Sequence, residues 1–106
     1  MVESISVKDL HPKWEASCTI IDVRSPEEYA KGHVPQASLI PLNALVARAG
    51  EVPKQGNVYL ICHSGGRSAQ AAMFLAKEHG HHNLVNVSGG TMAWMQAGYP
   101  VEQGGV

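Results

Sequence analysis

One stretch decides the fold: Val58-Tyr59-Leu60-Ile61-Cys62-His63-Ser64-Gly65-Gly66-Arg67. Its first four residues are apolar or aromatic without alternation, which is typical of a parallel strand buried on both faces. The next six are small or polar and include two adjacent glycines, and an alanine-rich helical pattern follows from Ser68 to His79. The stretch therefore predicts a strand, a tight loop and a helix in direct succession.

The same alternation of β-branched runs and helical patterns extends in both directions from this stretch. Such alternation predicts an α/β fold, in which helices cover a mainly parallel sheet. Glycines end several of the expected helices, and the tail after Gly98 is polar and expected to fray. The expected strands are 4–7, 19–23, 38–40, 58–61 and 84–87. The expected helices are 8–15, interrupted at His11-Pro12, and 25–31, 42–49, 68–79 and 91–97. Ser25 as N-cap and Glu28 three residues later predict the start of the second of these helices.

Length and composition set limits on the possible functions. The 106 residues fit one domain, residues 1–106, which needs no disulfide or structural metal to bury a core. Eight Lys and Arg nearly balance nine Asp and Glu, so nothing indicates nucleic acid or an anionic membrane as a partner. The sequence shows no apolar run of roughly 18 residues, the length of a membrane span, and no N-terminal segment like a secretory signal. Two cysteines suit a reducing compartment. We therefore expect a cytoplasmic protein.

The loop that begins at Cys62 suggests nucleophilic chemistry. A turn from strand to helix points backbone N–H groups inward, and the helix dipole and Arg67 add positive charge around the sulfur. Such surroundings lower a thiol pKa and favour the thiolate. Gly65 and Gly66 suit a loop that curls around one atom, because such a loop needs backbone angles that a Cβ resists. Spacing alone also fits a plain turn.

Three stretches resemble the signatures of the rhodanese family, and they occur in the family's order along nearly the whole chain. The first has Gln36 where the family usually has glycine. The stretches are Ile21-Asp22-Val23-Arg24 with Glu27-Glu28-Tyr29 and Gly32-His33-Val34-Pro35-Gln36-Ala37; Cys62 to Ser68; and Ser88-Gly89-Gly90 with Ala93-Trp94 and Gly98-Tyr99-Pro100-Val101.

This resemblance implies a rhodanese-like fold, with a five-stranded, mainly parallel sheet flanked by helices on both faces. It also implies a sulfurtransferase that needs no metal or organic cofactor. The Cys62 thiolate would take the sulfane sulfur of thiosulfate or a persulfide donor and pass it to cyanide, a thiol or a protein acceptor. Cys62 would be catalytic, and the donor would be bound by His63, Ser64, Gly65, Gly66 and Arg67.

Two other functions stay open at this stage. One is a sulfur-relay or regulatory module that keeps the fold and the cysteine without turnover. The other is a cysteine-based phosphatase or arsenate reductase, in which five residues separate Cys and Arg and a His precedes the Cys. Only four residues separate Cys62 from Arg67, and Ile61 precedes Cys62. The shorter loop suits a single sulfur better than a tetrahedral phosphate.

Arg67, His63 and Ser64 have roles that the sequence leaves open. Arg67 would either clamp the sulfonate of a donor or pair with a carboxylate and hold the loop. His63 and Ser64 would face solvent at the loop rim and shape the donor or acceptor preference. His63 replaces the basic residue often present in thiosulfate-preferring members, so thiosulfate is expected as an assay donor.

The other polar residues of the first signature are interpreted as structural. Asp22 and Arg24 would form a buried ion pair with Glu28 or tie down the backbone. His33 would satisfy a backbone group. Cys18 is interpreted as an inert buried thiol, with a resolving role for Cys62 as the alternative.

Histidines and large side chains near the C-terminus are also interpreted as structural. The histidines flank a helix end without further ligands at metal spacing, so no metal site is predicted. The last helix must bury one face, which predicts that its Trp and both Met residues are core. The histidines are His79, His81 and His82, and the expected core residues are Met92, Trp94 and Met95, with Trp14 and Tyr99.

Overall fold

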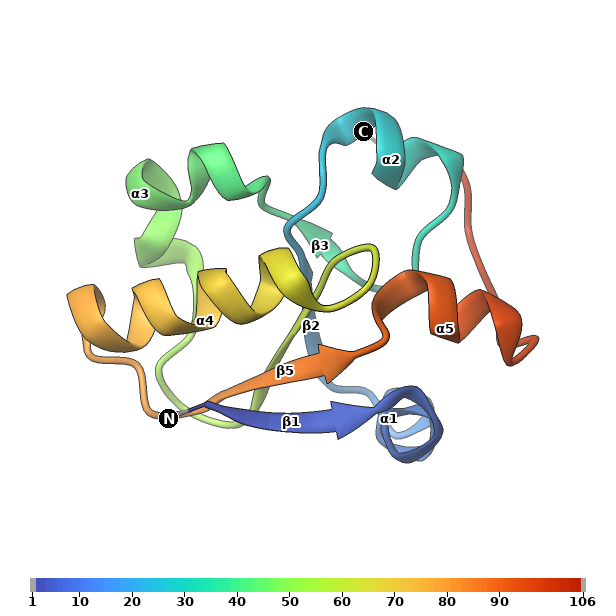
Figure 1. Ribbon diagram of the computed structural model, residues 1–106, viewed down its shortest axis with the longest axis horizontal. Coiled ribbons are helices and arrows are strands. Elements are labelled where there is room, and N and C mark those ends of the chain that lie inside the picture. Colours follow the sequence, from blue (N-terminus) through green and yellow to red (C-terminus); the bar gives the residue numbers. More distant parts are fainter. Residues whose placement is uncertain (1, 106) are drawn as a thin grey trace.

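The computed structural model describes residues 2–105 and has a five-stranded sheet between two layers of helices (Figure 1). The strand order is β1-β5-β4-β2-β3, and every neighbouring pair is parallel. The strands are β1 (Glu3–Ser6), β2 (Thr19–Asp22), β3 (Ser38–Leu39), β4 (Val58–Ile61) and β5 (Leu84–Ser88). The helices are α1 (Val7–Glu15), α2 (Pro26–Lys31), α3 (Leu45–Arg48), α4 (Gly66–His79) and α5 (Gly90–Gln96), with 3₁₀ turns at Leu42–Ala44 and Ala49–Glu51. The predicted α/β class and five-stranded sheet are confirmed.

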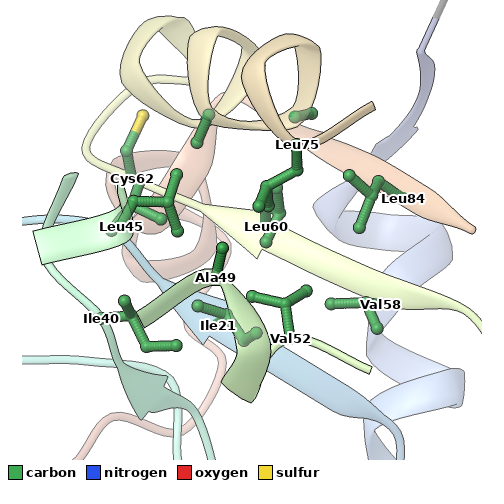
Figure 2. Close-up of a cluster of buried hydrophobic side chains, with 13 residues drawn as sticks. Ile21, Ile40, Leu45, Ala49, Val52, Val58, Leu60, Cys62, Leu75 and Leu84 are labelled. Carbon is green, nitrogen blue, oxygen red and sulfur yellow. The ribbon is translucent and has the colours of Figure 1, made fainter. Parts of the chain in front are cut away.

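β4 lies at the centre of the sheet, and all four of its residues are buried. Val58 and Leu60 face the layer formed by α3 and α4, whereas Tyr59 and Ile61 face the layer formed by α1, α2 and α5. Figure 2 shows the core on the side of α3 and α4, in which Leu60 of β4 lies next to Leu75 of α4. An unbroken apolar strand is thus explained by burial from both sides.

The parallel arrangement brings the carboxyl ends of β2, β4 and β5 to one edge of the sheet (Figure 1). Asp22, Ile61 and Ser88 are the last residues of these strands. Loops that follow such strand ends form the usual binding crevice of open α/β sheets. In the same described range, residues 2–105, the helices are too short or too polar to cross a membrane.

Helix α1 differs from the expected interrupted segment because it continues through Pro12. Ser6 caps its first turn by accepting a hydrogen bond from the Asp9 N–H at 3.1 Å, so Val7 starts the helix instead of ending the strand. The His11 ring stacks on the Tyr99 ring with 4.1 Å between centroids, and Leu10 is fully buried. Tertiary packing therefore outweighs the backbone hydrogen bond that proline cannot donate.

The segment expected as a helix over 42–49 is instead a 3₁₀ turn, the single α-turn α3 and a second 3₁₀ turn. Pro41 precedes the first 3₁₀ turn and Ala44 precedes α3, and neither residue caps the turn that follows it with a side-chain hydrogen bond. Gly50 lies inside the last turn and does not end the segment. Without a cap, burial of Leu45 and Ala49 is what holds this irregular segment against the sheet.

The polar tail is more ordered than the expected frayed end. Glu102 forms an antiparallel bridge with His33, with both backbone hydrogen bonds at 2.9 Å. The Gly104 N–H donates to the Ala30 carbonyl at 2.8 Å. The tail is thus held against α2 by backbone hydrogen bonds, which composition does not reveal.

Candidate active site

The candidate site is the loop between β4 and α4, at the carboxyl edge of the central strand. Cys62 follows β4 directly and is 1 % exposed. Figure 2 shows its sulfur pointing away from the apolar cluster and toward the first turn of α4. β4 and α4 are both firmly packed, so the cysteine is fixed between two rigid elements.

Hydrogen-bond donors surround the Cys62 sulfur. The Gly65 N–H donates to Sγ at 3.1 Å, and Ser68 Oγ lies 3.3 Å from Sγ. Burial by itself raises the pKa of the Cys62 thiol, but hydrogen bonds from Ser68 and from loop N–H groups outweigh burial, so the pKa lies below its ordinary value. The amino end of the 14-residue helix α4 faces the same sulfur. This arrangement stabilises a sulfur anion.

The amino end of α5 supports the loop from outside. The Thr91 N–H donates to the Cys62 carbonyl at 2.8 Å, and the Met92 N–H donates to the His63 carbonyl at 3.0 Å. These bonds turn the two carbonyls outward toward α5. The loop N–H groups are thereby left to face the sulfur, as in other anion-binding nests.

Gly90 makes this support possible. Its φ is +59°, and a Cβ at this position would lie 2.5 Å from the carbonyl oxygens of both Cys62 and His63. No side chain fits such a contact without moving backbone. The glycine pair Gly89-Gly90 of the third signature thus has a physical role that sequence reasoning did not assign.

Gly65 and Gly66 were both expected to need backbone angles that only glycine adopts readily, but only Gly65 does. Gly65 has φ +112°, which only glycine adopts readily. Gly66 is the first residue of α4, has no positive φ, and a Cβ there would contact nothing within 4 Å. The helix starts two residues earlier than predicted, so Gly66 has ordinary helical geometry.

Arg67 forms an ion pair with Glu28 of α2, which is one of the two roles that the sequence left open. Its Nη1 and Nη2 donate to the two carboxylate oxygens at 2.7 and 2.8 Å. The hydrogen bond from Arg67, despite partial burial, lowers the pKa of Glu28 to about 2. Glu28 also caps α2 reciprocally with Ser25, as its sequence pattern predicts. One carboxylate therefore joins the active-site loop to the start of α2.

Replacing Glu28 with glutamine tests this link through its pH dependence. A carboxyl group whose folded-state pKa lies below its ordinary 4.5 stabilises the fold above that pH and loses the effect as pH falls toward about 2. Both side chains are more than a third exposed, so about 1 kcal/mol or less is expected at neutral pH. Chemical unfolding of wild type and Glu28→Gln should show a difference at neutral pH that vanishes near pH 2. An equal difference at both pH values would contradict the assignment.

Asp22 and Arg24 pair with each other, so the expected partnership with Glu28 is wrong. Arg24 Nη2 lies 2.8 Å from Asp22 Oδ2, and both side chains are buried. Arg24 also donates to the Gly32 carbonyl at 2.8 Å. Glu28 is instead occupied by Arg67. The buried pair thus ties the end of β2 to the turn after α2, which is the structural role expected for it.

His63 and Ser64 are exposed at the rim of the loop, where the sequence placed them. A hollow of about 470 Å³ adjoins His63, and Met92 and Met95 line it. These two methionines are 41 % and 42 % exposed, so their assignment to the core is wrong. α5 buries the side that carries Trp94, and the two methionines lie on the opposite side of this short helix.

His33 and His81 have local structural contacts, whereas His82 is exposed. His33 Nδ1 lies 2.8 Å from the Tyr29 carbonyl, as predicted. His81 is buried, and its ring nitrogens lie 3.3 and 3.1 Å from backbone carbonyls. Within residues 2–105 no group of three or more candidate metal ligands occurs. Cys18 is only partly buried, so the expectation of a buried thiol is wrong. Its partial burial, more than the opposing effect of Lys13, still raises its pKa, in contrast to Cys62.

Two further residues belong to the surroundings of the sulfur and were not predicted, one in contact with it and one behind that residue. Ser68 is fully buried and contacts Sγ, and Asn86 of β5 contacts Ser68 in turn. The available signal was the polar Asn86 inside the otherwise apolar run Leu84 to Val87. Buried polar side chains usually have a specific hydrogen-bond partner.

Comparison with known proteins places this architecture in a family. The rhodanese-like domain model matches residues 6–97. A sulfurtransferase of Allochromatium vinosum is 37 % identical over 77 % of this chain and 76 % of its own length. The adenylyltransferase and sulfurtransferase of Ogataea parapolymorpha is 38 % identical over 87 % of this chain, which spans only 23 % of that longer protein.

A solved structure agrees with these sequence matches. The rhodanese-related protein of Thermoplasma volcanium superimposes with a TM-score of 0.87 at 33 % identity, over 96 % of this chain and 99 % of its own. The family match covers all the strands except the first and includes the whole Cys62 loop. The chain belongs to the rhodanese-like sulfurtransferase family.

Proposed function

We propose that this protein transfers sulfane sulfur through a persulfide on Cys62. The observation that carries the proposal is the Cys62 sulfur itself, a free thiol with a lowered pKa at the amino end of α4. Donors fixed around a sulfur anion cost no reorganisation when charge develops there. Membership in a sulfurtransferase family supports the same reaction.

The first half-reaction loads the cysteine. The Cys62 thiolate attacks the outer sulfur of thiosulfate or of a persulfide donor, and a new S–S bond forms. The S–S bond of the donor breaks, and its electron pair leaves on sulfite or on the donor thiolate. The outer sulfur then carries the negative charge next to the loop N–H groups, of which that of Gly65 donates to Sγ before the reaction. No external oxidant is required.

The second half-reaction releases the sulfur. An acceptor thiolate or cyanide attacks the outer sulfur, and the Cys62 thiolate leaves with the electrons of the broken bond. His63 and Ser64 at the exposed rim contact the donor or acceptor and set the preference between them. Gly65 and Gly66 contribute backbone N–H groups to this binding. Arg67 holds the loop through Glu28, because its guanidinium is already paired. Neither step needs a metal or an organic cofactor.

One domain, residues 1–106, would carry both steps, with a small sulfur donor and a thiol or protein acceptor as partners. A reducing location such as the cytoplasm suits the two free cysteines. Neither nucleic acid nor a membrane is needed for either half-reaction.

Steady-state kinetics distinguish this proposal from its alternatives. Varying thiosulfate at several fixed cyanide concentrations should give parallel double-reciprocal lines, because the two substrates never bind the same enzyme form. A sulfur-relay module without turnover would accept one sulfur per chain and then stop. A phosphatase would release phosphate from an aryl phosphate, which this enzyme should not do. Intersecting lines, or phosphate release faster than sulfur transfer, would overturn the proposal.

A further inference from the structure

The Ser68 hydroxyl lies between two polar side chains in the protein interior. Its oxygen is 3.3 Å from Cys62 Sγ and 2.5 Å from the side-chain oxygen of Asn86. Ser68 is 0 % and Asn86 8 % exposed. A serine hydroxyl has one proton and two lone pairs, so it cannot donate to both neighbours at once.

The charge on the sulfur decides which neighbour receives the proton. A neutral Cys62 thiol can donate to Ser68 Oγ, and Ser68 then donates to the oxygen of Asn86. A thiolate accepts only, so Ser68 must turn its proton to the sulfur, and its oxygen then needs a donor. Asn86 becomes that donor if its amide rotates and presents its NH₂ group.

Asparagine suits both arrangements because the oxygen and nitrogen of its amide have nearly the same shape. Asn86 lines a groove of about 680 Å³ between α4 and the β1 edge of the sheet. The amide atom that turns away from Ser68 therefore faces this groove and is not sealed in the core. Burial does not penalise either orientation strongly.

We propose that Asn86 is a positioning residue that acts on Cys62 through Ser68, by donating its amide N–H to Ser68 Oγ and so directing the Ser68 proton onto the ionised sulfur. Hydrogen bonds to an anion are stronger than neutral ones, and a chain of two polarises each member. Asn86 therefore favours the thiolate over the thiol. The inference deepens the proposed role of Cys62, but its test measures ionisation and not sulfur transfer.

The charged and titratable side chains around the loop have other partners or face solvent, so they cannot take over the hydrogen bonds from Asn86 to Ser68 and from Ser68 to Cys62. Arg67 on α4 is paired with Glu28 of α2, and Asp22 and Arg24 at the end of β2 are paired with each other. His63 on the loop is exposed at the rim. Among the described residues, the hydrogen bonds of these side chains do not involve Ser68 or Asn86, so we expect them to stay in place when Asn86 is replaced by a neutral residue.

A double-mutant cycle tests the proposal. The Cys62 pKa is measured from thiolate absorbance in four proteins that all carry Cys18→Ser. These are the parent Cys18→Ser protein and its Asn86→Leu, Ser68→Ala and Asn86→Leu/Ser68→Ala variants. Leucine has the same number of side-chain heavy atoms in the same branched arrangement but no hydrogen-bonding group. We expect Asn86→Leu to raise the Cys62 pKa by roughly 0.5 to 1 unit, and Ser68→Ala by about 1 unit. In the Ser68→Ala background, Asn86→Leu should add almost nothing, because its effect passes through the hydroxyl.

Asn83→Leu is the matched control. Asn83 donates to the Pro53 and Gly56 carbonyls at the opposite end of β5, so this change should lower the melting temperature and leave the Cys62 pKa unchanged. Asn86→Ala repeats the measurement if the leucine variant does not fold. An unchanged Cys62 pKa in a folded Asn86 variant would overturn the proposal. So would a pKa shift of the same size with and without Ser68.

Discussion

Cys62→Ser is expected to lose sulfur transfer, with kcat/KM for thiosulfate falling by at least about 10³-fold. A serine hydroxyl is not ionised near neutral pH and cannot form a persulfide. The hydroxyl still accepts the hydrogen bonds that now reach Sγ from Gly65 and Ser68, so the loop should keep its shape. Sulfite release and thiocyanate formation measure the two half-reactions separately.

Cys18→Ser is the control for that result. Cys18 is the other free cysteine, and burial raises its pKa, so it is a poor nucleophile near neutral pH. Its replacement should change the rate by no more than about twofold. Sulfur transfer that survives in Cys62→Ser, or disappears in Cys18→Ser, would contradict the assignment of the sulfur-carrying role to Cys62.

Gly90→Ala has the second largest expected effect and acts on the shape of the loop. The new methyl group would lie 2.5 Å from two backbone carbonyl oxygens, and the φ of +59° is itself unfavourable for alanine. Relief requires α5 to move away, which breaks the hydrogen bonds from Thr91 and Met92 to the loop. We expect a loss of about 2 to 4 kcal/mol in the free energy of unfolding, together with lower activity.

Gly66→Ala provides a matched comparison four residues after the cysteine. It adds the same methyl group at a helical position where nothing lies within 4 Å. Alanine lowers the entropy of the unfolded chain there, so the fold should be unchanged or more stable by up to about 1 kcal/mol. Denaturant unfolding compares both variants with wild type. Equal stability losses for the two would show that the contact behind the loop is unimportant.

Sequence patterns predicted those parts of the fold whose cause is local. The unbroken apolar run of β4 predicted its limits correctly, because burial on both faces removes any alternation. Ser25 and Glu28 predicted the start of α2 through their reciprocal cap. The 3₁₀ turns around α3 were missed, because helical spacing does not reveal that caps are lacking. Pro12 was misjudged because contacts from distant residues keep α1 continuous.

For the candidate site, the sequence predicted the Cys62 loop but not what surrounds it. Partners joined across distant segments, such as Arg67 with Glu28, have no spacing that identifies them. The exposure of Met95 depends on which side of α5 faces the sheet, and a seven-residue helix with few polar residues does not indicate that side. The glycine signature pointed to Gly90, but only its distance to the loop carbonyls explains why.

The mass of the Cys62 peptide after reaction with a sulfane donor tests the central claim most directly. The chain is treated with thiosulfate, the excess is removed, and the peptides that contain Cys62 and Cys18 are compared with and without later addition of cyanide. We expect one additional sulfur on the Cys62 peptide, none on the Cys18 peptide, and loss of that sulfur when cyanide is added. An unchanged Cys62 peptide with both thiosulfate and a persulfide donor would contradict it.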